Sequence, residues 1–172
     1  EHYLRRSNEE RSRLSALLDV VRMGILFMDA DRRVVFCNRA LYDIWGMPLG
    51  ESFVGVRDVA LQQYVMEFLE GPLDYQRHIT EVLEHREPSE PFEIHFKDGR
   101  VITDFSRVVP GPDGARPIGR MWVFEDVTEQ RRVAAQLMRL AERDPLTNLY
   151  NRRRFHEELE RMLADGRRHP QE

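Results

Sequence analysis

The sequence is poor in several features that mark particular classes of protein. Its single cysteine, Cys37, excludes an internal disulfide framework, so the fold depends on its core alone. No apolar run approaches the roughly 20 residues that cross a bilayer, and the first ten residues contain neither a methionine nor an apolar signal segment. Lys97 is the only lysine and the net charge is −4, so we expect no nucleic-acid partner. We expect a cytoplasmic piece of a longer protein, without membrane contact in this chain; an upstream anchor stays open.

What is present suffices for one domain with additional helices, since 41% of the 172 residues are apolar. A helix is predicted over residues 1–22, in a coiled coil or as a cap on its own domain, by a four-three-four spacing of Leu14, Leu18, Val21 and Ile25. Short apolar runs over 24–29 and 34–37 predict two strands joined by a turn. Their consecutive apolar residues predict that both faces are covered.

Three helices are predicted next. Asn38 is placed to cap the first, over 39–45, which Gly46 and Pro48 end. Asp58 is expected to cap the second, whose apolar side is formed by Leu61, Val65, Phe68 and Leu69. The third is predicted over 74–87, and its apolar face is formed by Tyr75, Ile79, Val82 and Leu83.

Three strands complete the pattern, over 92–96, 101–109 and 118–127, with a loop over 110–117. The last strand is apolar on both faces, so the N-terminal helix or a partner's copy of it is expected to cover the outside. Two strands, three helices and three strands, with helices at both ends, predict an α+β fold around a five-stranded antiparallel sheet.

Several motifs in this order resemble a PAS sensor domain over residues 20 to 132. They are the strand pair around 29–33, Phe36-Cys-Asn-Arg-Ala40, the hairpin Lys97-Asp-Gly-Arg100, and Glu125-Asp-Val-Thr-Glu-Gln-Arg-Arg132. The last is similar to the Asp-x-Thr that joins many PAS sheets to an output helix, here Asp126 and Thr128. Thr128 is expected to cap that helix and Asp126 to anchor the turn.

A second motif, Asp144-Pro-Leu-Thr-Asn-Leu-Tyr-Asn-Arg-Arg153, resembles the opening of GGDEF diguanylate cyclase domains. Family members more often have glycine at the position of Asn148, and asparagine tolerates left-handed backbone angles. The resemblance implies that the catalytic loop, and the GTP and magnesium sites, lie downstream. We therefore expect no catalysis in this chain and predict four segments: 1–22, 23–128, 129–143 and 144–172.

The helix after the sheet is expected to transmit a signal between these two domains. The residues assigned to coupling are Asp126, Thr128, Val133, Leu137, Leu140 and Asp144. The four-three spacing of the three apolar members predicts that two such helices pair in a parallel homodimer. Making cyclic di-GMP from two GTPs needs two facing catalytic domains, as the resemblance implies, so a rotation of the paired helices would set activity.

A small-molecule ligand in the PAS cavity is possible, and six residues are candidates to contact it: Asn38, Tyr42, Trp45, Phe105, Arg107 and Trp122. Arg107 would attract a carboxylate, although such an arginine more often pairs with an internal acid or faces solvent. Asn38 is explained at least as well by helix capping. The identity of any cofactor stays open.

His78 is the one candidate for a haem ligand, but a histidine at the edge of an apolar helix face is usually packed or solvated. Cys37 lacks the Asn-Cys-Arg context of flavin-linked photoreceptors, so a plain buried thiol is expected. No metal-ligand cluster or catalytic constellation is visible. The prediction is a sensory and dimerisation module of a diguanylate cyclase; the alternative is a ligand-free PAS platform for oligomerisation.

Overall fold

The computed structural model describes residues 2–114 and 116–168, which fall into two compact units divided after Thr128. The first and last residues of the predicted outer segments (1 and 169–172) and Ala115 of the predicted loop lie outside the described residues. None of the described helices combines the length and the apolar character that crossing a bilayer requires.

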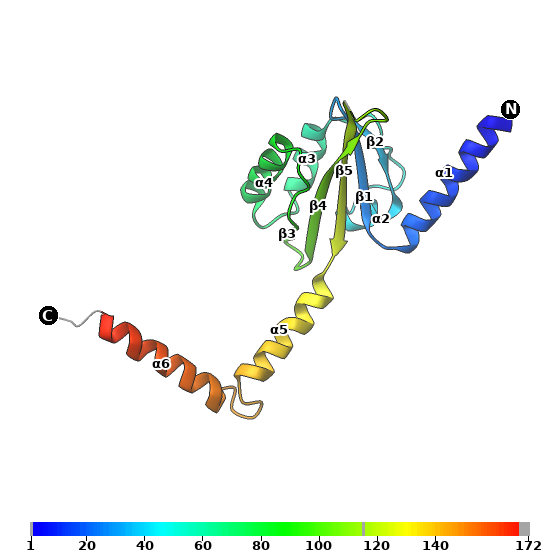
Figure 1. Ribbon diagram of the computed structural model, residues 1–172. Coiled ribbons are helices and arrows are strands. Elements are labelled where there is room, and N and C mark those ends of the chain that lie inside the picture. The colour runs from blue at the N-terminus through cyan, green and yellow to red at the C-terminus, as the bar shows by residue number, and fades with distance from the viewer. Residues whose placement is uncertain (1, 115, 169–172) are drawn as a thin grey trace. The chain divides into compact units, whose positions relative to one another are not determined.

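The first unit is built on an antiparallel sheet, and Figure 1 shows helices α3 and α4 beside it. Its strands run in the order β2-β1-β5-β4-β3. Their bounds are Gly24–Asp29 (β1), Val34–Cys37 (β2), Phe92–His95 (β3), Val101–Pro110 (β4) and Pro117–Asp126 (β5). The predicted α+β class with a five-stranded antiparallel sheet is therefore confirmed.

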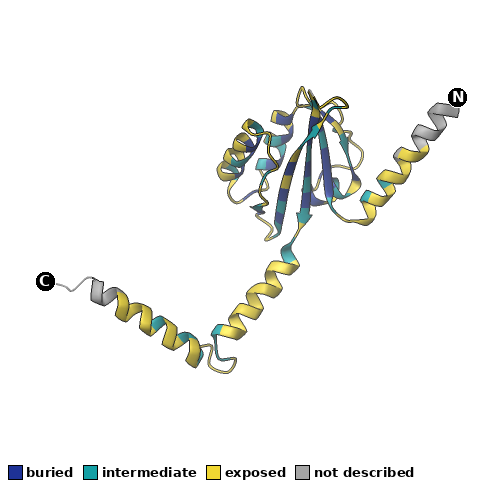
Figure 2. Ribbon diagram, in the orientation of Figure 1, coloured by how far each residue is buried: buried dark blue, intermediate teal, exposed yellow. Residues whose placement is uncertain are grey.

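Helices occur before, within and after this sheet. Their bounds are His2–Val20 (α1), Arg39–Trp45 (α2), Asp58–Met66 (α3), Pro72–Glu84 (α4), Thr128–Glu142 (α5) and Arg152–Arg168 (α6). Helices α2 to α4 all contribute buried side chains to one core, in which they meet Leu26, Trp122 and Phe124 of the sheet. The core therefore lies on a single face of the sheet (Figure 2).

Local signals position α2 as predicted. The Asn38 side chain accepts a hydrogen bond from the backbone N–H of Leu41 at 3.1 Å, and Gly46 ends the helix with φ of 64°. The Asn38 amide also accepts from Ile25 N–H and donates to the carbonyl of Met23, both at 2.8 Å. One buried side chain thus ties the start of α2 to the start of β1.

Several predicted helix ends are wrong, each for a local reason. The N-cap of α3 is Arg57, and Asp58 is its first residue. Helix α3 ends at Met66, before Phe68 and Leu69, because the chain there pairs with the sheet edge: Leu69 bridges Phe96. Helix α4 begins at Pro72 rather than two residues later, since proline's fixed φ suits the first turn of a helix.

Two predicted packing contacts are not found among the described residues: burial of both faces of the β1–β2 hairpin, and packing of this chain's N-terminal helix on the outer face of the sheet. Val35 of β2 is exposed, so that strand is not covered on both faces. Helix α1 ends at Val20, and most of its described side chains are exposed (Figure 2), Leu14 and Leu17 among them, while Leu18 is half-buried. The helix of the same chain therefore does not bury this apolar side on the sheet, and Ile25 belongs to β1 instead.

Candidate functional site

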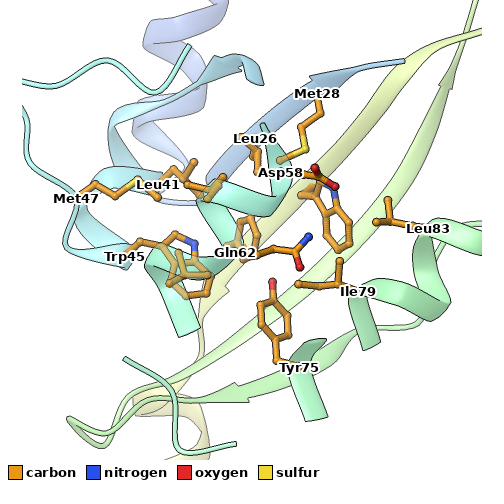
Figure 3. A pocket seen from close by; sticks show the side chains of 14 residues that line it. Leu26, Met28, Leu41, Trp45, Met47, Asp58, Gln62, Tyr75, Ile79 and Leu83 are labelled. Atoms are coloured by element: carbon orange, nitrogen blue, oxygen red, sulfur yellow. The ribbon is translucent and has the colours of Figure 1, made fainter. Parts of the chain in front are cut away.

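A cavity of about 50 Å³ lies between the core face of the sheet and helices α2, α3 and α4 (Figure 3). Its walls are largely apolar and include Leu26, Met28, Leu41, Trp45, Met47, Leu61, Val65, Ile79, Leu83, Trp122 and Phe124. Trp45 packs against Tyr75, Phe96 and Phe124, with ring centroids 5.0 to 6.3 Å apart. Large aromatic side chains thus fix one wall of the cavity.

Three polar side chains also line the cavity: Asp58, Gln62 and Tyr75. The Asp58 carboxylate accepts from Val59 N–H at 2.8 Å and lies 3.7 Å from the guanidinium of Arg32. The side chain of Gln62 makes no hydrogen bond to any residue that the structure describes, and Figure 3 shows the Tyr75 hydroxyl pointing toward its amide. Burial, and then the negative charge of Asp104, raise the pKa of Tyr75 well above 10.0.

Two of the predicted ligand residues, Trp45 and Trp122, line this cavity, and the other candidates do not. The side-chain amide of Asn38 is engaged in the hydrogen bonds to backbone groups described above. The Tyr42 hydroxyl accepts a hydrogen bond from Phe53 N–H at 3.4 Å and lies 3.5 Å from the Cys37 sulfur. Tyr42 and Cys37 are half-buried and pack against the core from outside the cavity.

The prediction that Phe105 and Arg107 share a cavity with Trp122 is wrong. Register places Ser106 opposite Trp122, and side chains alternate along a strand, so Phe105 and Arg107 lie on the other face of β4. The arginine buried in the core is Arg120, which donates to the Ser106 hydroxyl at 3.0 Å and to the carbonyl of His85 at 2.5 Å. Burial lowers the pKa of Arg120.

Beside the cavity, Asp104 and His78 form a buried pair. The Nε2 atom of His78 lies 2.8 Å from Oδ1 of Asp104, whose side chain is 0% exposed. The imidazole stacks on Phe92 with centroids 4.1 Å apart. His78 does not line the cavity, and its Nε2 is held by the Asp104 carboxylate, so this nitrogen is already engaged within the core.

The junction between β5 and α5 is held by two side chains. The Asp126 carboxylate accepts from the backbone N–H of Thr128 at 3.0 Å and from its hydroxyl at 2.5 Å, which confirms that Asp126 anchors the turn. The Thr128 hydroxyl accepts from Val101 N–H at 3.0 Å instead of capping the helix. The first residue of α5 is therefore tied to the first residue of β4.

In the second unit, the segment after α5 folds into a compact turn. The Asp144 carboxylate accepts from Leu146 N–H at 2.9 Å and from Thr147 N–H at 3.0 Å, and these bonds lower its pKa below 3.8. Asn148 has φ of 57°, the left-handed angle expected where glycine is more usual. Asn151 accepts from Arg154 N–H at 3.0 Å, which caps α6.

Asp58, Gln62, Tyr75, Asp104 and Arg120 were not among the predicted site residues. Helical spacing already placed Tyr75 with Ile79 on one face, so its place in the core followed from the sequence. Asp104 carried no such signal, because β4 mixes polar and apolar residues on both faces. Only register with β5 distinguishes its core face. Arg120, on β5, was missed although it shares the face of Trp122 and Phe124.

Comparisons with known proteins agree with this architecture. A family model described as "PAS fold" matches residues 18–135. The PAS domain of Bordetella pertussis BvgS superposes with a TM-score of 0.53 at 18% identity, over 78% of this chain and 98% of that one. An RNA-binding Light-Oxygen-Voltage receptor gives 0.50 at 20% identity, over 76% of this chain and 37% of that one. These two structures share the fold.

One curated protein is similar over most of the chain. It is named "Probable diguanylate cyclase DgcE", from Escherichia coli (strain K12), and is 28% identical over 171 residues. The alignment covers 90% of this chain and 14% of that protein, so the chain spans about a seventh of its length.

Proposed function

The chain belongs to the PAS fold family, and from that premise we propose that it is the sensory and dimerisation module that regulates a diguanylate cyclase. In this proposal residues 1–22 form an N-terminal helix, 23–128 the PAS sensor, 129–143 the signalling helix and 144–172 the start of the catalytic domain. Synthesis of cyclic di-GMP from GTP is the task of the catalytic core, which these residues do not include.

The observation that carries the proposal is the extent of the similarity to the E. coli protein. The alignment covers 90% of the chain, more than the PAS match over 18–135 can account for, so it continues beyond residue 135. The turn at Asp144 and the left-handed Asn148 support a defined domain start in that part of the chain.

Coupling would run from the cavity through the sheet to α5. Trp122 and Phe124 line the cavity on β5, which ends at Asp126, and the Thr128 hydroxyl bonds the start of β4. A ligand that prefers one arrangement of the paired helices tenfold shifts the equilibrium by about 1.4 kcal/mol, and full switching needs roughly 5.5 kcal/mol.

Dimerisation is supported by apolar side chains that the chain leaves uncovered. Val133, Leu137 and Leu140 of α5 are exposed, as is Phe105 on the outer face of the sheet. A second copy would bury them, and the apolar side of α1 is available to cover the outer face in the partner.

The test is the output of a diguanylate cyclase domain that follows these residues in one chain. Ile79→Phe fills the cavity, and we expect the rate of cyclic di-GMP formation to change about tenfold in either direction, the effect of about 1.4 kcal/mol. Gln76→Phe introduces the same aromatic ring on the exposed side of α4 and serves as the control. Equal rates for Ile79→Phe and the unchanged protein, both folded, would refute regulation through the cavity.

The small cavity favours one alternative, a PAS platform that oligomerises without a ligand. Mass spectrometry of the purified protein, released under denaturing conditions, separates the two functions. A co-purified small molecule supports sensing. A ligand-free dimer supports the platform if the rate of cyclic di-GMP formation is the same with and without Ile79→Phe.

A further inference from the structure

The size of the cavity sets the size of what it holds. A buried water needs about 10–15 Å³ of such volume, so about 50 Å³ corresponds to roughly four water-sized positions. Pockets that bind drug-sized ligands have volumes of about 300–1,000 Å³. The cavity therefore fits a molecule of about four or five non-hydrogen atoms, and flavin or haem does not fit.

The charge of the lining limits the charge of the ligand. Of the fourteen described residues that line the cavity, Asp58 alone carries a charge, and Arg32 lies 3.7 Å from its carboxylate. An anion would lie beside Asp58 without a cation in the lining. A cation would have to compete with Arg32 and lose its own hydration, and burying an uncompensated charge is costly. An uncharged ligand meets neither penalty.

Two neutral groups of the lining, the Gln62 amide and the Tyr75 hydroxyl, both donate and accept hydrogen bonds, whereas the indole N–H groups of Trp45 and Trp122 donate only. The Gln62 amide has no hydrogen-bond partner among the described residues, and the Tyr75 hydroxyl points toward it (Figure 3). Tyr75 keeps its proton, because burial, the charge of Asp104 and an interaction of the hydroxyl with that carboxylate raise its pKa, and the hydroxyl oxygen accepts from a ligand. An amide and a phenol each donate and accept, so a hydroxyl between them makes both kinds of hydrogen bond.

We propose that the cavity binds a small uncharged molecule of about four or five non-hydrogen atoms, apolar except for one hydroxyl group, which Gln62 and Tyr75 orient. The inference rests on the proposed sensory function and names the chemical class of its ligand. The apolar walls receive the chain of such a molecule, as in a primary alcohol, and Asp58 selects against carboxylates.

Three probes of nearly equal size test whether the cavity prefers an uncharged ligand: 1-butanol, butyrate and n-butylammonium. Each is titrated into the 172-residue chain at pH 7 while backbone amide shifts are followed by NMR. We expect saturable shifts at cavity-lining residues with 1-butanol, and binding at least about tenfold tighter than with either ion. Tighter or equal binding of an ion, or no saturable shift with 1-butanol, would overturn the proposed class.

Substitutions test the polar contact. Gln62→Leu keeps the approximate size of the side chain and removes its hydrogen bond, so we expect 1-butanol to bind about 2- to 10-fold more weakly. Gln63→Leu makes the same change at the exposed neighbour and leaves binding unaltered. Unchanged affinity in Gln62→Leu would contradict the assigned contact, and Tyr75→Phe repeats the test from α4 where the first variant does not fold.

The two proposals fail in different ways. If Ile79→Phe changes cyclase output while the ions bind better than 1-butanol, the sensor remains and the ligand class is wrong. If 1-butanol binds as expected while Ile79→Phe leaves the rate of cyclic di-GMP formation unchanged, the ligand class stands and regulation through the cavity is wrong.

Discussion

Asp104 and His78 show how a single buried pair supports the core beside the cavity. The carboxylate is fully buried on β4, one oxygen is 2.8 Å from His78 Nε2, and the other oxygen has no hydrogen-bond partner among the described residues. A buried carboxylate is costly unless it is paired. Removing its imidazole partner should therefore cost more than the hydrogen bond itself contributes.

We expect His78→Leu to lower the free energy of unfolding by about 3 kcal/mol, because the Asp104 carboxylate stays buried without its partner. Urea denaturation at pH 7 measures the change. His95→Leu replaces an exposed histidine on β3 and should cost less than about 0.5 kcal/mol. The double variant His78→Leu/Asp104→Leu should be more stable than His78→Leu alone; a double variant that is less stable would show that the pair is not what holds the carboxylate.

Residues with local signals were predictable, and residues that depend on distant strands were not. Asn38 and Gly46 act on their own helix, so sequence position alone assigned both ends of α2. The correct face of β4 depends on its register with β5, which pairs Ser106 with Trp122. The sequence of β4 alone does not show how it aligns with β5. The prediction therefore assigned Phe105 and Arg107 to the wrong face of β4 and placed them in the cavity.

At the scale of elements, the order was predictable and several ends were not. The hairpin of β3 and β4 follows from Lys97-Asp-Gly-Arg100, in which Gly99 takes φ of 88°. The end of α3 could not be predicted from the local sequence, because the residues that follow it pair with the edge of the sheet. Lys97 N–H donates to the carbonyl of Phe68 at 2.9 Å. Tertiary pairing overrides the apolar periodicity there.

The turn after α5 should open in acid. Because two backbone N–H groups bond the charged carboxylate, the pKa of Asp144 is lower in the folded turn than the ordinary 3.8. A lowered pKa means that this stabilisation is present above 3.8 and disappears as the pH falls through the folded value. We expect the side-chain carboxyl of Asp144 to titrate below 3.8 by NMR, together with the Leu146 and Thr147 amides.

Thr147→Ala provides the control for that titration. It removes the hydroxyl that lies 3.3 Å from the Asp144 carboxylate and keeps both backbone donors, so most of the lowered pKa should remain. An Asp144 carboxyl that titrates at 3.8 or above in the unchanged protein would contradict the role given to these hydrogen bonds.

At the scale of the whole molecule, α5 carries an apolar stripe that is exposed. The helix has fifteen residues and spans about 22 Å, at ~1.5 Å per residue. Leu137 is 62% exposed, and it shares the stripe with Val133 and Leu140. Fully burying one such side chain stabilises an interface by about 1.5–3 kcal/mol, so a second copy of the helix gains most by pairing along this stripe.

We therefore expect sedimentation velocity to detect a dimer at micromolar concentration. Leu137→Glu places a charge in the paired stripe and should weaken association about 100-fold, the effect of about 2.8 kcal/mol. Gln136→Glu introduces the same charge at the neighbouring exposed position and should leave the dimer intact, because that side chain lies off the stripe. A monomer in the unchanged protein, or equal loss of dimer in both variants, would mean that α5 does not pair through Leu137 and that signalling through paired helices needs another interface.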